Sequence, residues 1–512
     1  MSENQDQLKE ELEKRAHNRT QRPQGAAFRE FMGEDWGARP AGPVRAEVAD
    51  YLPNRHYRLG RQFIGQRLVI PAGDLQVRSN DTDYRFRAHS AFSHLTGLGG
   101  EDEPGAVLVL HPLNVTETEA ANNSATHEAV LYFQPRSSRS SEEFYADSRH
   151  GEFWVGARLS AQEMATLTGL KVSPISTLRD ELAKDLGPDQ IQIRVIAEAD
   201  SQITALVNEL RQENGLNTSA SELDFALSAA ASEIRLTKDS WEINELQKAV
   251  NITGEGFTEI LRNLPRAINH WRGERVVEGA FGAKAREEGN GLGYDTIAAS
   301  GNHANTLHWI SNDGPVREGD LILVDAGVEV DSLYTADITR TLPVNGKFSE
   351  AQREVYEAVL EAAEAAFAKA NEPGARFRDL HAAAMEVIAK YLETWGMLPG
   401  TAAESLSPEG QQHRRWMPHG TSHHLGLDVH DCAQAKRELY QDAVLEEGMV
   451  FTIEPGLYFR EDDLKVPQRF RGIGVRIEDD IVITANGAVR LSEDIPRTVA
   501  DIEAWIAESQ SN

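Results

Sequence analysis

Residues 320–342 read DLILVDAGVEVDSLYTADITRTL, and this stretch decides the fold of the C-terminal half of the chain. Its first apolar run predicts a buried strand that ends on Asp325, and a second β-like segment at 335–342 carries Asp337. A hairpin centred near Asp331 would place the two aspartates opposite each other, with Cβ atoms about 4.5–5.5 Å apart. Two carboxylates at that distance repel each other unless a cation lies between them. The stretch therefore indicates a metal site, whereas each aspartate taken alone is more typical of an ordinary turn.

Helical patterns and further strands flank this stretch. A capping-box pattern at Ser349 opens one helix, and a second helix is expected at about 378–395. Strands are expected at 449–456 and at 474–484. Since helices are followed by strands in two rounds, we predict an α+β domain of two similar halves over residues 231–505.

The N-terminal half alternates short apolar runs with helical stretches. The runs lie at 67–70, 106–110, 129–133 and 191–196. This alternation predicts a smaller α/β domain over residues 46–230, and a chain of 512 residues is long enough for two domains. Residues 1–45 are polar with scattered glycine and proline, so we expect a partly disordered N-terminal arm there.

The composition is that of a soluble protein from a reducing compartment. Acidic residues outnumber basic ones by 81 to 52, and the resulting net charge of −29 argues against nucleic acid as a partner. No stretch approaches the ~20 consecutive apolar residues that span a bilayer, and the charged first residues lack the apolar centre of a secretory signal. The single cysteine, Cys432, cannot form an internal disulfide. We therefore expect a cytoplasmic protein without a membrane partner.

Two glutamates in the predicted C-terminal strands are further candidate ligands. Glu454 ends the strand 449–456, where a charge at the end of a buried run needs a partner. Glu478 shares one face of its strand with Arg476 because side chains alternate with a period of two. That second pair is equally consistent with a salt-bridged surface strand.

Histidines are concentrated in WMPHGTSHHLGLDVHDC, residues 416–432, which holds His419, His423, His424 and His430. Four carboxylates with one imidazole form an oxygen-rich set that favours Mn²⁺ or another divalent cation over a thiolate zinc site. Bridging carboxylates hold two ions about 3.5–4 Å apart, the spacing of dinuclear hydrolases. The set therefore predicts metal-assisted hydrolysis.

These segments resemble the methionine aminopeptidase, prolidase and creatinase superfamily, whose fold is called pita-bread, and its aminopeptidase P branch in particular. Besides the stretch 320–342, the resemblance lies in YDTIAASGNHANTLHW (294–309), HGTSHHLGLDVHD (419–431), EEGMVFTIEPGLYF (446–459) and GVRIEDDIVIT (474–484). RSNDTDYRFRAHSAFSHLTGL (78–98) is similar to the N-terminal domain of that branch. The resemblance implies an α+β pita-bread catalytic domain behind a smaller α/β domain.

The resemblance also implies roles for individual residues. Two divalent ions per subunit, expected to be manganese, would be held by Asp325, Asp337, His423, Glu454 and Glu478. Asp337 and Glu478 would bridge the ions, and Glu454 would carry a proton from the attacking hydroxide towards the leaving nitrogen. The catalytic and substrate-binding residues around the ions would be His308, His419, His430, Arg476 and Tyr458.

The aminopeptidase P branch implies release of the N-terminal residue from peptides with proline in second position, by a homo-oligomer, either a dimer or a tetramer. The X-Pro bond is a tertiary amide without an N–H group, so it requires a dedicated pocket. A prolidase, which cleaves only Xaa-Pro dipeptides, shares all five ligands and stays open as an alternative. A non-catalytic peptide- or protein-binding module of the same fold is a second alternative, and creatine hydrolysis is disfavoured because that branch lacks the metal set.

Two histidines depart from the pattern of the family. His424 and His94 stand where an aromatic or apolar residue is expected. Either substitution could change the substrate pocket, but neither concerns a proposed metal ligand.

Overall fold

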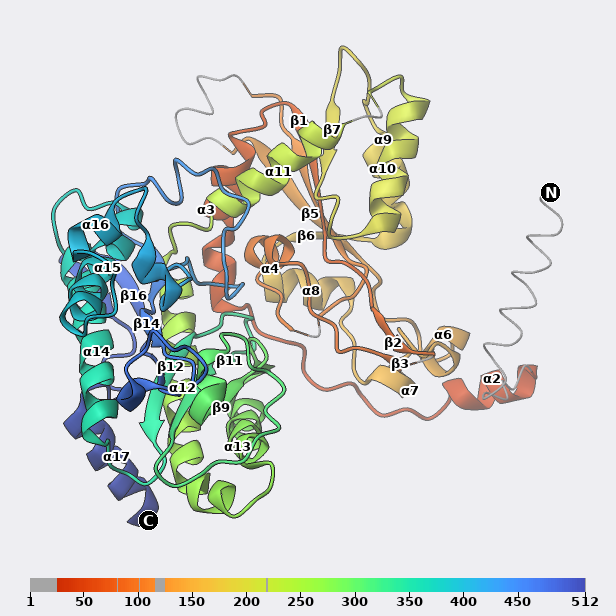
Figure 1. Cartoon of the computed structure of the whole chain (residues 1–512). Coiled ribbons are helices and arrows are strands. Elements are labelled where there is room, and N and C mark those ends of the chain that lie inside the picture. The colour runs from red at the N-terminus through yellow and green to blue at the C-terminus, as the bar shows by residue number, and fades with distance from the viewer. Residues whose placement is uncertain (1–24, 81, 101, 116–124, 218–219, 512) are drawn as a thin grey trace, which may run out of the picture. The chain divides into compact units, whose positions relative to one another are not determined.

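The computed structural model describes residues 25–80, 82–100, 102–115, 125–217 and 220–511 (Figure 1). The chain divides into two compact units, Met1–Leu227 and Ser228–Asn512. Residues 1–24 of the predicted N-terminal arm lie outside the described residues, and the rest of the arm includes the helix α2 (Ala26–Gly33). No helix in the described part of the chain is long and apolar enough to cross a membrane.

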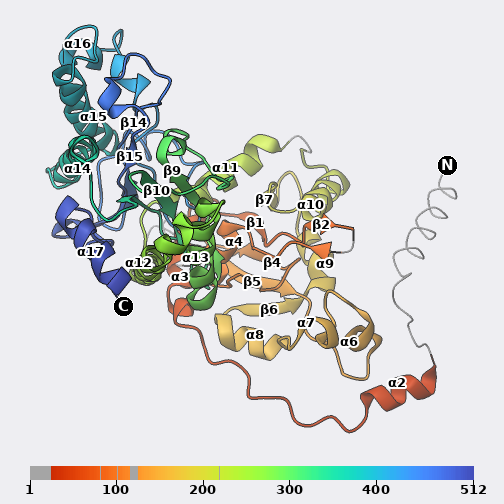
Figure 2. The ribbon, with the colours of Figure 1, turned by 60° about the horizontal axis from the view of Figure 1, so that its bottom comes forward.

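The first unit is built on a mixed five-stranded sheet in the order β6-β5-β4-β1-β7. Its strands are β1 (Gln66–Pro71), β4 (Val107–Pro112), β5 (His127–Phe133), β6 (Lys171–Pro174) and β7 (Gln192–Val195), and β2 (Val77–Ser79) pairs with β3 (Thr82–Asp83) apart from it. Figure 2 shows β1, β4, β5 and β6 side by side. The inner strands β1 and β4 are buried along most of their length, which is why they read as continuous apolar runs.

Short helices complete the first unit. They are α3 (Leu52–Gly60), α4 (Ser90–Thr96), α6 (Glu142–Ala146), α7 (Glu152–Val155), α8 (Ala161–Thr168), α9 (Leu178–Ala183) and α10 (Ser201–Glu213). The helix α11 (Ser221–Glu233) runs across the division between the units. The predicted α/β class of the N-terminal half is therefore confirmed.

The second unit contains two helix pairs and two three-stranded sheets. Its helices are α12 (Ser240–Ile268), α13 (Gly273–Glu288), α14 (Glu350–Ala370), α15 (Phe377–Thr394), α16 (Ala402–Leu406) and α17 (Val499–Ser511). The sheet β12-β10-β9 comprises Ile338–Pro343, Leu321–Ala326 and Ile297–Ser300, and the sheet β13-β16-β17 comprises Val450–Ile453, Asp479–Thr484 and Gly487–Arg490. Two short pairs, β11-β8 (Val328–Glu329, Gly291–Leu292) and β14-β15 (Gly456–Tyr458, Gly474–Arg476), complete the unit.

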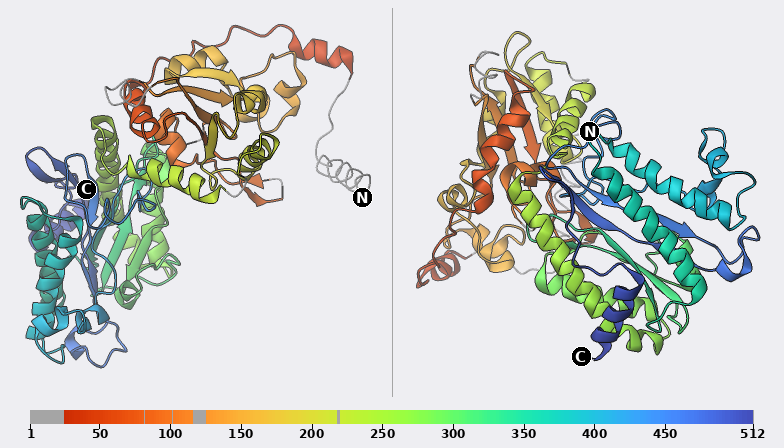
Figure 3. Two further views of the ribbon diagram at one scale, coloured as in Figure 1. Left: turned by 90° about the horizontal axis from the view of Figure 1, so that it is seen from above. Right: turned by 90° about the vertical axis from the view of Figure 1, so that its left-hand side faces the viewer.

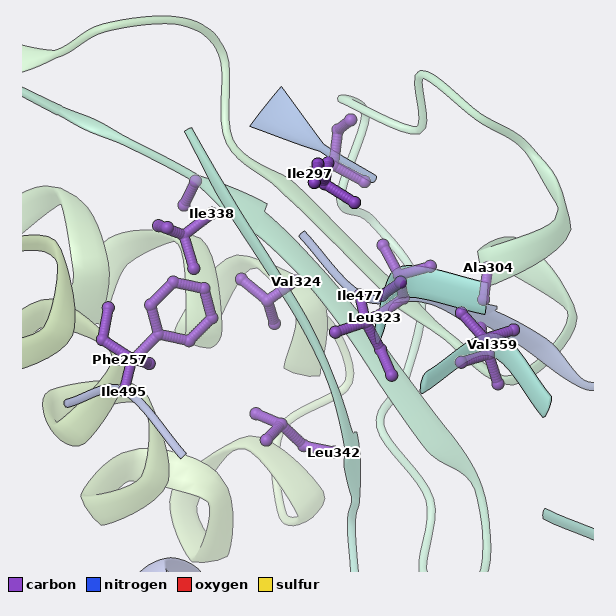
Figure 4. Packing of buried hydrophobic residues seen from close by; sticks show 14 of the residues in the cluster. Phe257, Ile297, Ala304, Leu323, Val324, Ile338, Leu342, Val359, Ile477 and Ile495 are labelled. Atoms are coloured by element: carbon purple, nitrogen blue, oxygen red, sulfur yellow. The ribbon is translucent and has the colours of Figure 1, made fainter. Parts of the chain in front are cut away.

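Helices cover both sides of these strands. The right-hand view of Figure 3 shows the yellow-green α12 and the teal α14 on either side of them. In Figure 4 the side chain of Val324 in β10 points towards the face of the strand where Phe257 of α12 lies. The side chain of its neighbour Leu323 points towards the opposite face, where Val359 of α14 lies. All four side chains belong to one buried cluster. Because successive strand residues face opposite sides, both faces of β10 are buried, and the predicted α+β domain is confirmed.

The register of the β10–β12 hairpin differs from the predicted one. Asp325 is opposite Thr339, and Asp337 lies just before β12 begins at Ile338. The expectation that the two aspartates are directly opposed was therefore wrong by two residues. Since Asp337 is two residues from Thr339, the aspartates form a diagonal pair on one face, which still brings their carboxylates together.

Two predicted strands are each broken at a candidate ligand. The expected strand 449–456 divides into β13 and β14 around Glu454, and the expected strand 474–484 divides into β15 and β16 around Glu478. The cause is a change of sheet, because β13 pairs with β16 whereas β14 pairs with β15. At each break the backbone leaves one sheet for the other, and the glutamate side chain lines a cavity instead of a sheet face.

Candidate metal centre and substrate pocket

The four candidate carboxylates line one cavity of about 540 Å³ in the second unit. Asp325 is the penultimate residue of β10, and Asp337, Glu454 and Glu478 lie at the strand boundaries just described. One ligand atom each from Asp337, His423 and Glu478 lie within 4.8 Å of one another. His423 Nε2 is also 3.6 Å from Glu454 Oε1. The structure therefore gathers all five residues that the sequence assigned to the metal site.

The cavity wall combines this polar set with apolar side chains. The lining residues are Tyr294, Asp295, Ile297, Leu307, His308, Ile310, Asp325, Asp337, His419, Gly420, Ser422, His423, Val429, His430, Glu454, Arg476 and Glu478. Every candidate site residue except Tyr458 is among them. An acidic floor with an apolar wall suits a ligand that has a charged or polar reacting group and an apolar ring.

Burial and mutual repulsion raise the pKa of most of these carboxyl groups. The pKa of Glu478 rises well above its usual range because the group is buried and lies near Asp337 and the other carboxylates. Burial likewise raises the pKa of Asp325, and raises that of Glu454 to about 7. A divalent cation would relieve this repulsion, so the residues fit the ions that their chemistry implies.

His423 carries the complementary shift. Its burial lowers the pKa, but the hydrogen bond with Asp337 and the negative charge of Glu454 outweigh burial and raise the pKa to about 9. His423 Nε2 lies 3.3 Å from Asp337 Oδ2. Without a metal the imidazole thus shares a proton with the carboxylates, and the same nitrogen is free to face a cation once that proton leaves.

A chain of hydrogen bonds fixes His419 in one tautomer. Arg476 Nη1 donates to Tyr458 Oη at 3.1 Å, and Tyr458 Oη lies 2.7 Å from His419 Nε2. His419 Nδ1 lies 2.6 Å from the carbonyl oxygen of Gly420. Burial and the charge of Arg476 lower the pKa of His419 to about 3, so the ring is neutral. His419 therefore donates from Nδ1 and accepts at Nε2 from Tyr458, which lies behind the cavity wall as a support.

Arg476 connects the same chain to the metal site. Its Nη2 donates to Asp325 Oδ2 at 2.5 Å, and its Nε donates to Thr339 Oγ1 at 3.1 Å. Thr339 Oγ1 in turn donates to Glu478 Oε2 at 2.7 Å. Arg476 thus orients two candidate ligands, one directly and one through a threonine hydroxyl.

Tyr294 is a site residue that the sequence did not single out. Its hydroxyl lies 2.7 Å from Asp325 Oδ1 and 2.5 Å from Asp337 Oδ1. Burial and both aspartates raise its pKa well above the usual range, so the hydroxyl keeps its proton and donates. The one available signal was that the family-like segment 294–309 begins with this tyrosine.

Replacing Tyr294 by phenylalanine removes this donor and keeps the ring. Because partners that orient metal ligands typically contribute 10- to 100-fold, we expect Mn²⁺ affinity or kcat/KM to fall by about that factor. Calorimetric Mn²⁺ titration and peptide cleavage measure the two quantities. Tyr391→Phe, which removes a surface hydroxyl bonded to Glu361, is the matched control. Unchanged affinity and activity in Tyr294→Phe would contradict the assigned role.

The two unusual histidines lie outside the cavity lining. His424 is fully buried, and its ring stacks on Phe377 with centroids 4.8 Å apart and planes 11° apart. It therefore occupies an aromatic slot, although it follows His423 directly. His94 is 1% exposed within α4 of the first unit. Neither ring is among the described residues that line the pocket.

Comparisons with known proteins agree with this geometry. Residues 244–485 match the model of metallopeptidase family M24, and residues 52–193 match the aminopeptidase P N-terminal domain. "Xaa-Pro aminopeptidase 1" of Streptomyces coelicolor is 47% identical over 453 residues, which cover 88% of this chain and 86% of the relative. "Xaa-Pro aminopeptidase" of Escherichia coli is 32% identical over 450 residues, covering 87% of this chain and 95% of the relative.

A solved structure of E. coli aminopeptidase P, in its low-pH form, superposes with a TM-score of 0.76 at 30% identity and covers 91% of this chain and 99% of that one. The pita-bread fold of the second unit and the aminopeptidase P-like first unit are therefore confirmed. The family match also confirms that the chain is a peptidase, a hydrolase that depends on divalent metal. The chain belongs to the Xaa-Pro aminopeptidase, or aminopeptidase P, family of M24 metallopeptidases.

Proposed function

We propose that this metallopeptidase releases the N-terminal residue from peptides whose second residue is proline. The observation that carries the proposal is the complete set of four carboxylates and one imidazole around a single cavity. Relatives at up to 47% identity over most of the chain are named Xaa-Pro aminopeptidases. A binding module of this fold would have no need to keep five buried or half-buried ionisable side chains together, because such a cluster is costly unless it holds a cation.

The same five residues would hold two divalent ions, for which we propose manganese. Oxygen ligands with a single imidazole match the preference of Mn²⁺ over softer metals. Ions bound there supply Lewis-acid polarisation of the scissile carbonyl and make water a better nucleophile near neutral pH. Asp337 and Glu478 suit the bridging positions because their carboxylates face each other and His423 within one cluster.

Glu454 is the proposed general acid–base. Its side chain lines the cavity beside the other candidate ligands, where a carboxyl group can accept and release a proton during the reaction. Glu454 Oε2 also lies 3.6 Å from His419 Nδ1. The carboxyl would take a proton as water attacks and deliver it to the proline nitrogen, which has no hydrogen of its own until the bond breaks.

Three histidines are proposed to hold the substrate. His308, His419 and His430 line the cavity, and His430 packs edge-on against His423 with ring centroids 4.5 Å apart. His308 and His430 would donate N–H hydrogen bonds to the carbonyl oxygens of a peptide and to the charge that develops during attack. His419, whose two ring nitrogens already bond Gly420 and Tyr458, would contact the substrate through its ring. The apolar side chains of Leu307 and Val429 line the same cavity and offer contact for a pyrrolidine ring.

A panel of three peptides tests the proposal. We expect release of arginine from Arg-Pro-Pro, which is lost after chelation and restored by Mn²⁺, and little release from the matched peptide Arg-Ala-Pro. Amino-acid analysis of the products gives the rates, and reconstitution with Mg²⁺ or Zn²⁺ tests the choice of metal. Cleavage of the dipeptide Ala-Pro alone would make the protein a prolidase. No cleavage of any peptide by Mn²⁺-loaded protein would favour the binding module.

Localisation, oligomeric state and domain limits complete the proposal. We propose a cytoplasmic homo-oligomer, either a dimer or a tetramer, which light scattering on the purified chain would distinguish. The single cysteine, Cys432, is buried and suits a reducing compartment. Domain limits at 46–230 and 231–505 are supported by the division of the chain after Leu227.

A further inference from the structure

The loop from Ser300 to Gly314 forms part of the wall of the cavity that holds the candidate metal ligands. It supplies Leu307, His308 and Ile310. The imidazole of His308 is exposed, and among the described residues it has no hydrogen-bond partner. Its position at the cavity therefore depends on how firmly the backbone of this loop is held.

One carboxylate holds the loop at both ends. Glu274, the second residue of α13, is fully buried. Its Oε1 accepts hydrogen bonds from Ser300 N at 2.8 Å and His303 Nδ1 at 2.7 Å. Its Oε2 accepts from Trp309 Nε1 at 2.9 Å and Gly314 N at 2.6 Å. Four donors from fifteen residues of loop thus converge on a side chain that comes from a different element.

The surroundings leave the carboxylate no alternative position. The rings of His303 and Trp309 stack with centroids 3.9 Å apart, so two of the four donors also fix each other. A Cβ atom at Gly314 would lie 2.7 Å from Glu274 Oε2, which means that only glycine allows this approach. Each oxygen of Glu274 accepts two N–H groups, which satisfies the hydrogen-bonding capacity of this buried side chain. A buried carboxylate that lost these donors would bear the full cost of its desolvation.

A second strut acts on the same loop without contacting Glu274. Asn312 is buried, its Oδ1 accepts from Ala298 N at 3.0 Å, and its Nδ2 donates to Thr296 O at 2.8 Å. This pair ties the end of the loop to the start of β9. Of Glu274 and Asn312, only Glu274 bonds the part of the loop between His303 and Trp309, which contains His308.

We propose that Glu274 is a positioning residue for the peptidase reaction, which fixes the loop 300–314 so that His308 meets the substrate. The claim that His308 meets the substrate rests on the proposed function. The anchoring of the loop stands on the geometry of the second unit by itself. It assigns a role in substrate positioning to a residue that lines no part of the cavity.

A double-mutant cycle tests the catalytic part. Glutamine at position 274 places an NH₂ group against two of the four donors, so we expect Glu274→Gln to lower kcat/KM for Arg-Pro-Pro on the order of 10- to 100-fold. If the effect passes through His308, the same change in a His308→Ala background lowers kcat/KM by less than about twofold. Glu287→Gln, an exposed charge removal on the same helix, should leave the rate unchanged. Additive losses, or no loss from Glu274→Gln, would overturn the proposal.

Amide hydrogen exchange tests the anchor independently of activity. Because Ser300 N and Gly314 N donate directly to Glu274, peptides covering 299–314 should exchange faster in Glu274→Gln, with the sheet strands β10 and β12 unchanged. Trp309→Phe removes one donor and keeps an aromatic side chain, so it should give a smaller increase in the exchange rate of the same peptides. Unchanged exchange in both variants would overturn the anchor even in an active enzyme. Faster exchange in a protein that cleaves no Xaa-Pro peptide would support the anchor and reject only the proposed function.

Discussion

Replacing Glu478 by glutamine is expected to abolish peptide cleavage and to raise the thermal stability of the metal-free protein. Glu478 is 1% exposed, and its pKa is raised well above the usual range by burial and by Asp337, Glu454 and Asp325. Glutamine has nearly the same shape and keeps an oxygen that accepts the Thr339 hydroxyl, now bonded at 2.7 Å. It therefore removes repulsion without opening a cavity, and at the same time it removes one carboxylate from the proposed metal-binding set.

The dependence of stability on pH follows from the direction of these shifts. A carboxyl group whose pKa is higher in the folded than in the unfolded state binds more protons when folded. Its contribution to stability is greatest below the unfolded pKa of about 4.3 and falls as the pH rises towards the folded pKa. Asp325 and Glu454 shift in the same direction as Glu478. The contribution of these three groups to the stability of the metal-free protein should therefore fall as the pH rises from about 4.5 to 8, and the difference between wild type and Glu478→Gln isolates the part that belongs to Glu478.

Metal reverses that trend because cations and protons compete for the same oxygens. Mn²⁺ binds the deprotonated ligands, so the stabilisation it provides should grow with pH. Each pKa unit corresponds to about 1.4 kcal/mol, which makes the change measurable for a single group. In Glu478→Gln the slope of stability against pH should be shallower, and the increase in Tm on adding Mn²⁺ should be smaller.

Calorimetry between pH 5 and 8, with chelator and with Mn²⁺, measures these differences. We expect cleavage of Arg-Pro-Pro to fall by more than about 100-fold, because a direct ligand matters more than the partners that orient it. Glu447→Gln, an exposed change close in sequence to β13, is the control for loss of one negative charge. A lower Tm of metal-free Glu478→Gln, or an unchanged response to Mn²⁺, would show that Glu478 is not part of a repulsive metal-binding cluster.

Two of the candidate ligands, Asp325 and Glu454, could be marked from the sequence because each follows an apolar run. Asp325 and Glu454 stand at the ends of strands that are buried along their whole length, and a charge in that position needs a partner. The mixed helix and strand architecture followed from periodicity in the same way. Local pattern thus predicted the architecture and marked candidate ligands, whereas the full set of five proposed ligands came from the family resemblance.

What local pattern missed are the places where a strand changes partners. The alternation of side chains with a period of two continues through Ile477 and Glu478. The pairing partner nevertheless changes there, because β15 before this point pairs with β14 and β16 after it pairs with β13. The hairpin register was missed for a related reason, because the turn adds its own short pairing, with Glu329 bridging Thr335. Pairing partners are a tertiary property, and a single strand does not encode them.

Polar residues whose partners lie far away in the sequence were missed as well. Tyr294 and Glu274 have no periodic signal, since each bonds to groups on other elements. Arg340 is the extreme case in the second unit. Nothing in the sequence around it marks Arg340 as buried, whereas the structure places it at 0% exposure.

Replacing Arg340 by methionine is expected to destabilise the second unit by about 3–5 kcal/mol, the usual cost of breaking a buried ion pair. Its guanidinium donates to five acceptors: Thr339 O, Glu478 O, Asp479 Oδ1, Ile495 O and Pro496 O, at 3.0, 2.6, 2.8, 3.1 and 2.7 Å. Burial would raise the pKa of Asp479, but Arg340 outweighs it and holds the pKa below the usual range. Methionine occupies much of the space but leaves the carbonyl groups without this donor, and it leaves Asp479 with the weaker support of Ser492 Oγ at 2.8 Å and Arg490 Nε at 3.7 Å.

The expected loss corresponds to a fall in Tm on the order of 10 °C for a unit of this size. Activity should fall too, because the carbonyl group of Glu478 loses the donor that fixes its backbone beside the metal site. Arg353→Met, on the exposed face of α14, is the matched control and should change stability by less than about 0.5 kcal/mol.

The double variant Arg340→Met with Asp479→Asn separates the two sources of the loss. If most of the lost stability comes from the Asp479 carboxylate without its Arg340 partner, neutralising Asp479 recovers much of the stability. The remaining cost is then that of carbonyl groups without donors. If the double variant is no more stable than Arg340→Met, the loss comes from the four hydrogen bonds that anchor β12 to the segments 478–479 and 495–496. A Tm of Arg340→Met within about 2 °C of wild type would contradict both accounts, because a buried guanidinium with five acceptors would then contribute almost nothing to the catalytic unit.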